Sequence, residues 1–195
     1  MIVAAAVNLS GSEVVFSAPL MAPDLAANDF DLLQLPQQFN INLQLLEQNW
    51  KALQRYVHPD MHAHADASAQ RLSMQWSVRI NEAYQRLKTP IKRAAYLCEL
   101  RGVSIEADTN TAMPTDFLMQ QIEWREALDA ATTPRAIDEL HAEVKAYRMA
   151  LLSECQRWID ELADFQQAAT SVRSLMFVDR FIQAILLQSD RLESA

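Results

Sequence analysis

The chain has 195 residues, 50% of them hydrophobic, and a formal net charge of −8 with a pI near 5.0. This acidic balance argues against nucleic-acid binding as the main role, because Lys and Arg supply most contacts to phosphate. No apolar run approaches the roughly 18 residues of a membrane-spanning helix, so no membrane segment is expected. Ala, Leu, Gln and Glu are abundant and only 2 Gly occur, which predicts an all-α fold.

Residues 1–27 contain no Lys or Arg. A secretory signal needs a basic start and a mitochondrial transit peptide needs arginines, so neither is expected. We expect residues 1–27 to be a disordered extension, with Met21 as an alternative start.

The first elements form a predicted helical hairpin. Residues 30–35 should be a short helix or turn closed by Pro36, and Asn42 can cap a helix over residues 43–57. This helix and the next one each carry an apolar face, made of Leu46, Trp50, Leu53 and Val57 in the first and Leu72, Trp76, Ile80, Ala83 and Leu87 in the second.

The turn between the two helices begins with His58-Pro59-Asp60. Pro59 fixes its own φ and disfavours helical backbone at His58, so the first helix should end there. A short connection between such helices favours an antiparallel pair, which would hold His58 and Asp60 at an exposed tip.

Lys51 and Arg55 lie four residues apart on the polar side of the first helix. Like charges at this spacing are slightly unfavourable. One interpretation is a contact surface for an acidic partner. The other is a solvent-exposed helix face, which would show the same pattern.

His62 and His64 follow the tripeptide and give the pattern H-x3-H-x-H with His58. Three histidines could bind zinc and activate water, as in a metal-dependent hydrolase. A ligating histidine needs a rigid second shell, whereas these lie among Ala and Ser. We therefore expect solvated loop histidines, no metal site and no cofactor.

The rest of the first half contains one more predicted helix, over residues 91–101, with Thr89 as cap, Pro90 in its first turn and Gly102 at its end. Residues 103–113 should be a polar linker. Cys98 and Cys155 form no CxxC pattern, which favours a reducing compartment and two apolar, buried or half-buried thiols without a disulfide.

The second half is predicted to be a three-helix bundle. Its helices should cover residues 116–131, a long stretch capped by Thr133 and opened by Pro134 that reaches about residue 162, and a last helix to about residue 191. Asp164 with Gln167 can form a capping box for the last one.

The first helix of the bundle carries more apolar surface than one packing face needs. Its core stripe consists of Phe117, Gln121, Trp124 and Leu128. Leu118, Met119 and Ile122 lie elsewhere on the helix, on a side shared with Glu126 and bordered by Glu123. This second stripe should face solvent or a partner, unless it packs against the first domain.

The last helix has a core stripe made of Val172, Leu175, Val178, Ile182 and Ile185. Phe177 and Phe181 form a separate aromatic pair. This pair is either a satellite core contact or a second part of the same partner surface.

The first half resembles the J-domain family of co-chaperones. The resemblance rests on His58-Pro59-Asp60, on Trp50, Lys51, Leu53, Arg55 and Tyr56 before it, and on residues 29–36, 80–87 and 92–97. Two positions depart from the family pattern: Val57 stands where Tyr is usual, and Met61 where Lys is frequent. The basic face of the first domain therefore carries fewer positive charges than is usual in the family.

Residues 117–129 and 172–179 are similar to the C-terminal domain of the HscB family, and the whole resemblance covers about residues 28–190. It implies an L-shaped pair of helical domains, a J-domain at 28–102 and a three-helix scaffold-binding domain at 114–195. The implied partners are an HscA-type chaperone, contacted by His58, Pro59, Asp60, Lys51 and Arg55, and an IscU-type cluster scaffold, contacted by Leu118, Met119, Ile122, Glu123, Glu126 and Phe177.

The resemblance further implies a monomeric, cytoplasmic bacterial protein that stimulates the chaperone's ATPase and is not itself an enzyme. The alternatives are a general J-domain co-chaperone for other clients and the His-rich metal-dependent hydrolase.

Overall fold

The computed structural model of the chain describes residues 26–57, 67–105 and 113–193, and every regular element in these ranges is helical. The elements are α1 (Asp29–Leu32), α2 (Leu43–Tyr56), α3 (Ala67–Lys88), α4 (Pro90–Leu100), α5 (Thr115–Ala130), α6 (Pro134–Gln156), the π-helical turn η2 (Arg157–Glu161) and α7 (Phe165–Glu193). The prediction of an all-α fold is confirmed. None of the described helices has the length and apolar character needed to cross a membrane.

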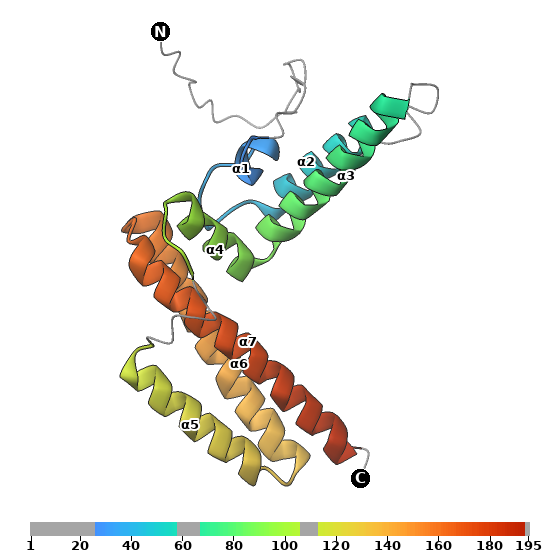
Figure 1. The fold of residues 1–195 in the computed structure, drawn as a ribbon. Coiled ribbons are helices and arrows are strands. Elements are labelled where there is room, and N and C mark those ends of the chain that lie inside the picture. Colours follow the sequence, from blue (N-terminus) through green and yellow to red (C-terminus); the bar gives the residue numbers. More distant parts are fainter. Residues whose placement is uncertain (1–25, 58–66, 106–112, 194–195) are drawn as a thin grey trace, which may run out of the picture.

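The helices form two arms (Figure 1). The N-terminal arm contains α1 to α4, with α2 and α3 side by side as the predicted hairpin. The C-terminal arm contains α5, α6, η2 and α7, which form the predicted three-helix bundle. The arms meet where α4 packs against α7, and they diverge from this junction, so the molecule is bent.

Three of the predicted helix caps are confirmed by their hydrogen bonds. The Thr133 hydroxyl accepts from the N–H of Ala136 at 3.3 Å, at the start of α6. The Asn42 side chain accepts from the backbone N–H groups of Gln44 and Leu45 at 3.0 and 3.1 Å, at the start of α2. Asp164 accepts from the N–H of Gln167 at 3.0 Å, at the start of α7. These bonds satisfy donors that have no partner within the helix.

The junction between α3 and α4 differs in detail from the prediction. Thr89 precedes Pro90, but its side chain makes no capping bond to α4. Its hydroxyl instead donates to the carbonyl of Gln85 at 3.0 Å, at the end of α3. Gly102 follows α4 with φ of 76°, a left-handed conformation that glycine adopts without strain.

The expected inward position of Leu72 is wrong. Leu72 is 47% exposed, whereas its neighbour Ser73 is buried. The Ser73 hydroxyl donates to the carbonyl of Val57, the residue that ends α2. The last carbonyls of a helix lack partners within that helix. A hydroxyl at position 73 gives the Val57 carbonyl a donor, which an apolar side chain could not do.

A buried ion cluster fixes α1 against the hairpin. Asp29 is fully buried, and its carboxylate pairs with Arg79 at 2.6 Å and with Arg86 at 2.8 Å. The Asp29 backbone N–H donates to the Tyr96 hydroxyl at 3.0 Å, and Arg86 lies over the Tyr96 ring. Side chains from α3 and α4 thus hold Asp29 of α1, through its carboxylate and its backbone N–H respectively.

The junction of the arms is held by Asp160 of η2. Its two carboxylate oxygens accept the backbone N–H groups of Phe39 at 2.6 Å and Asn40 at 2.9 Å. The guanidinium of Arg93, from α4, lies over the Phe39 ring. Burial lowers the pKa of Arg93 to about 10, and the charge of Asp160 opposes this shift. Both arms therefore contribute to one polar contact.

Replacement of Asp160 by Ala is expected to lower the free energy of unfolding by about 1–2 kcal/mol, because the N–H of the buried Phe39 loses its acceptor. Chemical denaturation followed by circular dichroism measures the change. Asp138→Ala is the matched control, since Asp138 is an exposed carboxylate on α6. Equal denaturation midpoints for the two variants would contradict the proposed role of Asp160.

The two cysteines are free and buried, as expected. The Cys98 thiol donates to the carbonyl of Phe165 across the junction of the arms, at 3.7 Å. Burial, with a smaller contribution from Glu99, raises the pKa of Cys98 to about 11. Burial likewise raises the pKa of Cys155 to about 12. Both thiols therefore stay protonated near neutral pH.

Candidate functional site

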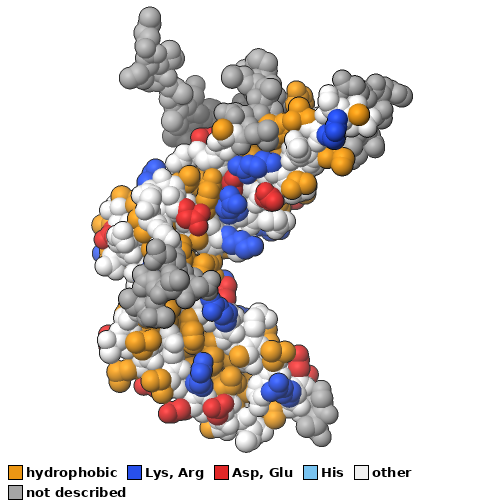
Figure 2. All heavy atoms as spheres, viewed as in Figure 1, with side chains coloured by type: hydrophobic (Ala, Val, Ile, Leu, Met, Phe, Trp, Pro, Cys, Tyr) orange, Lys and Arg blue, Asp and Glu red, His pale blue; other side chains and the backbone are white. Residues whose placement is uncertain are grey.

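The outward face of α5 is the main candidate surface. Leu118, Met119 and Ile122 are 43%, 59% and 59% exposed. None of these side chains packs against the N-terminal arm, so that alternative does not hold. Glu123 and Glu126 are also exposed and border the apolar side chains. Figure 2 shows hydrophobic side chains gathered over the C-terminal arm, with acidic and basic side chains among them.

An open groove of about 550 Å³ runs along this face. Of the six side chains expected to contact a scaffold, Leu118, Ile122 and Glu126 line this groove, whereas Met119, Glu123 and Phe177 do not. The groove also includes Gln121, Arg125 and Asp129, which the sequence reasoning did not select. Their spacing could have identified them, because residues 118, 121, 125 and 129 follow each other at helical steps of three and four.

The opposite face of α5 is anchored by two large aromatic residues. Phe117 and Trp124 are buried, as predicted for the core stripe. Trp124 stacks on Phe181 of α7 and meets the edge of Tyr147 of α6, with ring centroids 5.8 and 5.0 Å apart. The Trp124 indole N–H donates to Glu143 at 2.8 Å. With one face so firmly packed, the exposed stripe has a fixed position.

Phe177 and Phe181 belong to this aromatic cluster. The two rings stack with centroids 6.2 Å apart, and Phe177 meets the edge of Phe117 at 5.7 Å. Phe181 is buried and Phe177 is half-buried. The pair is thus a satellite core contact, and Phe177 keeps part of its ring exposed.

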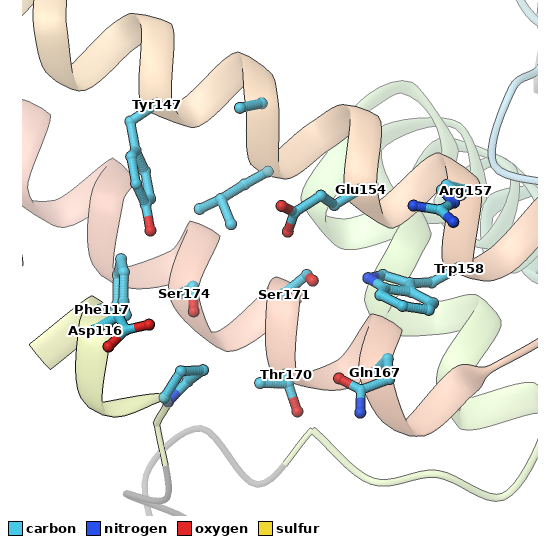
Figure 3. Close-up of a pocket in the computed structure, with 13 residues that line it drawn as sticks. Asp116, Phe117, Tyr147, Glu154, Arg157, Trp158, Gln167, Thr170, Ser171 and Ser174 are labelled. Atoms are coloured by element: carbon cyan, nitrogen blue, oxygen red, sulfur yellow. The ribbon is translucent and has the colours of Figure 1, made fainter.

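A second cleft, of about 310 Å³, lies between the start of α5 and the other helices of the arm (Figure 3). Tyr147 of α6 points toward Phe117 of α5 there, with ring centroids 5.9 Å apart. Burial raises the pKa of Tyr147, and the charges of Glu154 and Asp116 add to the shift. No predicted site residue lines this cleft, so it is separate from the exposed face of α5.

The exposed side of α2 carries Lys51 and Arg55, as expected. Lys51 forms an ion pair with Glu47 at 2.6 Å, and this contact lowers the pKa of Glu47. The Arg55 guanidinium donates to the carbonyl of Lys51 at 3.3 Å. The carboxylate of Glu47, one turn before Lys51, thus offsets the repulsion between Lys51 and Arg55.

The predicted tripeptide, His58, Pro59 and Asp60, lies outside the described residues, as do His62 and His64. The described chain stops at Val57, directly after α2, and resumes at α3. Among the residues that the structure describes, no group of three or more His, Cys, Asp or Glu side chains could hold a metal ion. The histidine-based metal hypothesis concerns residues beyond that set.

The geometry defines a two-armed, all-α protein with a helical hairpin on one arm and an exposed apolar helix face on the other. Residues 113–186 match the family model described as the HSCB C-terminal oligomerisation domain. The chain is 46% identical over 163 residues to the co-chaperone protein HscB homolog of Bordetella pertussis, covering 83% of this chain and 96% of that protein. It is 44% identical over 173 residues to the Burkholderia multivorans homolog, with coverages of 87% and 98%.

Two solved structures share the fold. The chaperone HscB from Vibrio cholerae matches with a TM-score of 0.74 and 31% identity, covering 85% of this chain and 99% of that one. The human co-chaperone protein HscB matches with a TM-score of 0.81 and 28% identity, with coverages of 91% and 92%. The chain belongs to the HscB co-chaperone family. It is a co-chaperone and not an enzyme.

Proposed function

We propose that this co-chaperone acts in iron–sulfur cluster assembly by linking an HscA-type chaperone to an IscU-type scaffold. The N-terminal arm stimulates ATP hydrolysis by the chaperone, and its contact residues are His58, Pro59, Asp60, Lys51 and Arg55. The C-terminal arm binds the scaffold, and its contact residues are Leu118, Met119, Ile122, Glu123, Glu126 and Phe177.

The exposed apolar face of α5 is the observation that carries this proposal. Leu118, Met119 and Ile122 remain in solvent although the other side of α5 is packed through Phe117 and Trp124. Contiguous large apolar side chains with a charged border are typical of a docking surface for a protein partner. Glu123 and Glu126 would select a partner with complementary cations.

The two arms give the protein its proposed mechanism. A scaffold held on α5 is carried to the chaperone when the hairpin binds there, so its effective concentration at the chaperone rises. Asp60 is suited to a charge-assisted pair with an arginine of the chaperone. The chaperone performs the hydrolysis, and this chain supplies no acid, base or nucleophile.

Phe177 has a supporting role in this proposal. Its ring contacts Phe117 and Phe181, so it holds α5 against α7. The exposed part of the ring can extend the apolar surface toward the scaffold. We further propose that the protein works as a monomer in the bacterial cytoplasm. The Bordetella and Burkholderia homologs, which are 46% and 44% identical to it, are bacterial proteins.

The test is the ATPase rate of the HscA-type chaperone with this protein, with the IscU-type scaffold, and with both. We expect the two together to stimulate more than the sum of their separate effects, because this protein brings the bound scaffold to the chaperone. Stimulation by this protein alone, without synergy, would favour a general J-domain co-chaperone. No stimulation by a folded sample would overturn the proposal.

A further inference from the structure

The outward side of α3 carries a second exposed apolar face. Met74 and Val78 are 56% and 58% exposed, although they lie on a helix whose other side is packed. With Gln75, Arg79 and Glu82 they line a shallow groove of about 360 Å³. This groove lies on the N-terminal arm, whereas the candidate scaffold surface lies on α5 of the other arm.

The chain itself passes the end of this groove. The Arg79 guanidinium, which lines the groove, donates to the carbonyl of Ala27 at 3.0 Å. The same side chain pairs with the buried Asp29, so the start of the described chain is fixed at the Arg79 side of the groove. Residues 1–25 therefore join the described chain close in sequence to Ala27, whose carbonyl is held by a residue that lines this groove.

The composition of the preceding residues fits the groove. Leu20, Met21 and Leu25 are apolar, and Pro19 and Pro23 favour extended backbone. Residues 1–25 contain no Lys or Arg, so they bring no cation toward Arg79. Attachment to the same chain adds effective concentration, so a small apolar contact suffices to hold such a segment.

We propose that residues 20–25 of this chain dock along the outward face of α3, with Leu20, Met21 and Leu25 against Met74 and Val78. This contact goes beyond the proposed chaperone and scaffold binding. It assigns an intramolecular partner to a face that would otherwise expose two large apolar side chains, and it gives the N-terminal segment a defined place on the hairpin.

Disulfide trapping in the full chain tests this contact. The pair Met21→Cys and Met74→Cys places one thiol on the segment and one in the groove. The control pair is Met21→Cys and Gln85→Cys. Gln85 is exposed on the same side of α3, six residues after Arg79, while Met74 lies five residues before it. A segment that is only tethered would reach both positions equally. The native thiols are buried and do not compete.

Under mild oxidation, we expect the Met74 pair to form its intramolecular disulfide about tenfold faster than the Gln85 pair. Adding Leu20→Ser and Leu25→Ser should lower the Met74 rate to the Gln85 rate, because the tether is unchanged and only the apolar contact is lost. Peptide mapping without reduction measures both. Equal rates for the two pairs, or a Met74 rate unaffected by the Ser substitutions, would overturn the proposal. Predominant disulfide-linked dimers would overturn it too, in favour of a second copy on this face.

Discussion

Replacement of His58 by Gln is expected to reduce stimulation of the HscA-type ATPase to the rate of the chaperone alone, while binding of the IscU-type scaffold is unchanged. His58 directly follows Val57, which is buried and whose carbonyl accepts from Ser73 of α3. The residue directly before the tripeptide is thus held against α3 by burial and by a hydrogen bond. The exposed face of α2, with Lys51 and Arg55, lies directly before it.

The reason for the large expected effect is that the contact is local and has no substitute. The core of the N-terminal arm consists of residues such as Leu46, Ile80 and Leu87, which are fully buried and do not depend on His58. The proposed scaffold surface lies on α5 of the other arm. The variant should therefore fold and bind the scaffold but fail at the chaperone.

The measurement is steady-state ATPase activity against the concentration of the variant, together with scaffold affinity by calorimetry. Gln85→Ala serves as the control, because Gln85 is an exposed polar residue on the outward side of α3. Retained stimulation by the His58→Gln variant would remove the tripeptide from the proposed chaperone contact.

Replacement of Ile122 by Asp is expected to weaken scaffold binding by about a hundredfold. Ile122 is 59% exposed and lines the groove on α5 beside Glu126. Central apolar anchors of an interface commonly contribute about 2–4 kcal/mol, and about 1.4 kcal/mol corresponds to a tenfold change in affinity. A new carboxylate beside Glu126 adds repulsion and a desolvation cost.

Met149→Asp is the matched control, since Met149 is 60% exposed on α6 and is not part of the groove. Both substitutions place one carboxylate at an exposed apolar site, so a general effect of charge would affect both equally. Calorimetric titration with the scaffold measures the affinities. Similar affinities of the two variants would remove Ile122 from the scaffold surface, and basal ATPase stimulation without scaffold should be unchanged in both.

The helices and their apolar faces could be predicted because they depend on local signals. Asn42, Pro90, Gly102 and Asp164 mark helix ends through their own backbone and side-chain chemistry, and the structure places these ends within a residue or two of the prediction. The second apolar stripe of α5 also followed from periodicity alone, because Phe117 and Trp124 already filled the packing face.

Contacts between distant segments could not be predicted in this way. Asp29 appeared as one acidic residue in an opening segment, yet it is the fully buried partner of Arg79 and Arg86. Asp160 appeared near the end of a long helix, yet its carboxylate joins the two arms through Phe39 and Asn40. Neither pairing could be inferred from sequence spacing, because the partners lie far apart along the chain.

The position of Leu72 and the role of Phe177 show a second kind of limit. Periodicity ranked Leu72 as inward because it is apolar, but the end of α2 required a hydroxyl, which Ser73 supplies. Phe177 could be placed off the main core stripe, but only the positions of Phe117 and Phe181 decide how much of its ring remains exposed.

The burial of both thiols has a consequence for the binding of metal ions by this chain. Thiolates are the groups that bind iron and zinc and that react with oxidants, and a thiol with a pKa of about 11 or 12 is almost wholly protonated in a cell. In the proposed function the protein brings a cluster-bearing scaffold to a chaperone, and a chain without thiolates of its own would not compete for that cluster. Cys98 and Cys155, the two cysteines of the sequence, meet that condition because both thiols are buried and protonated.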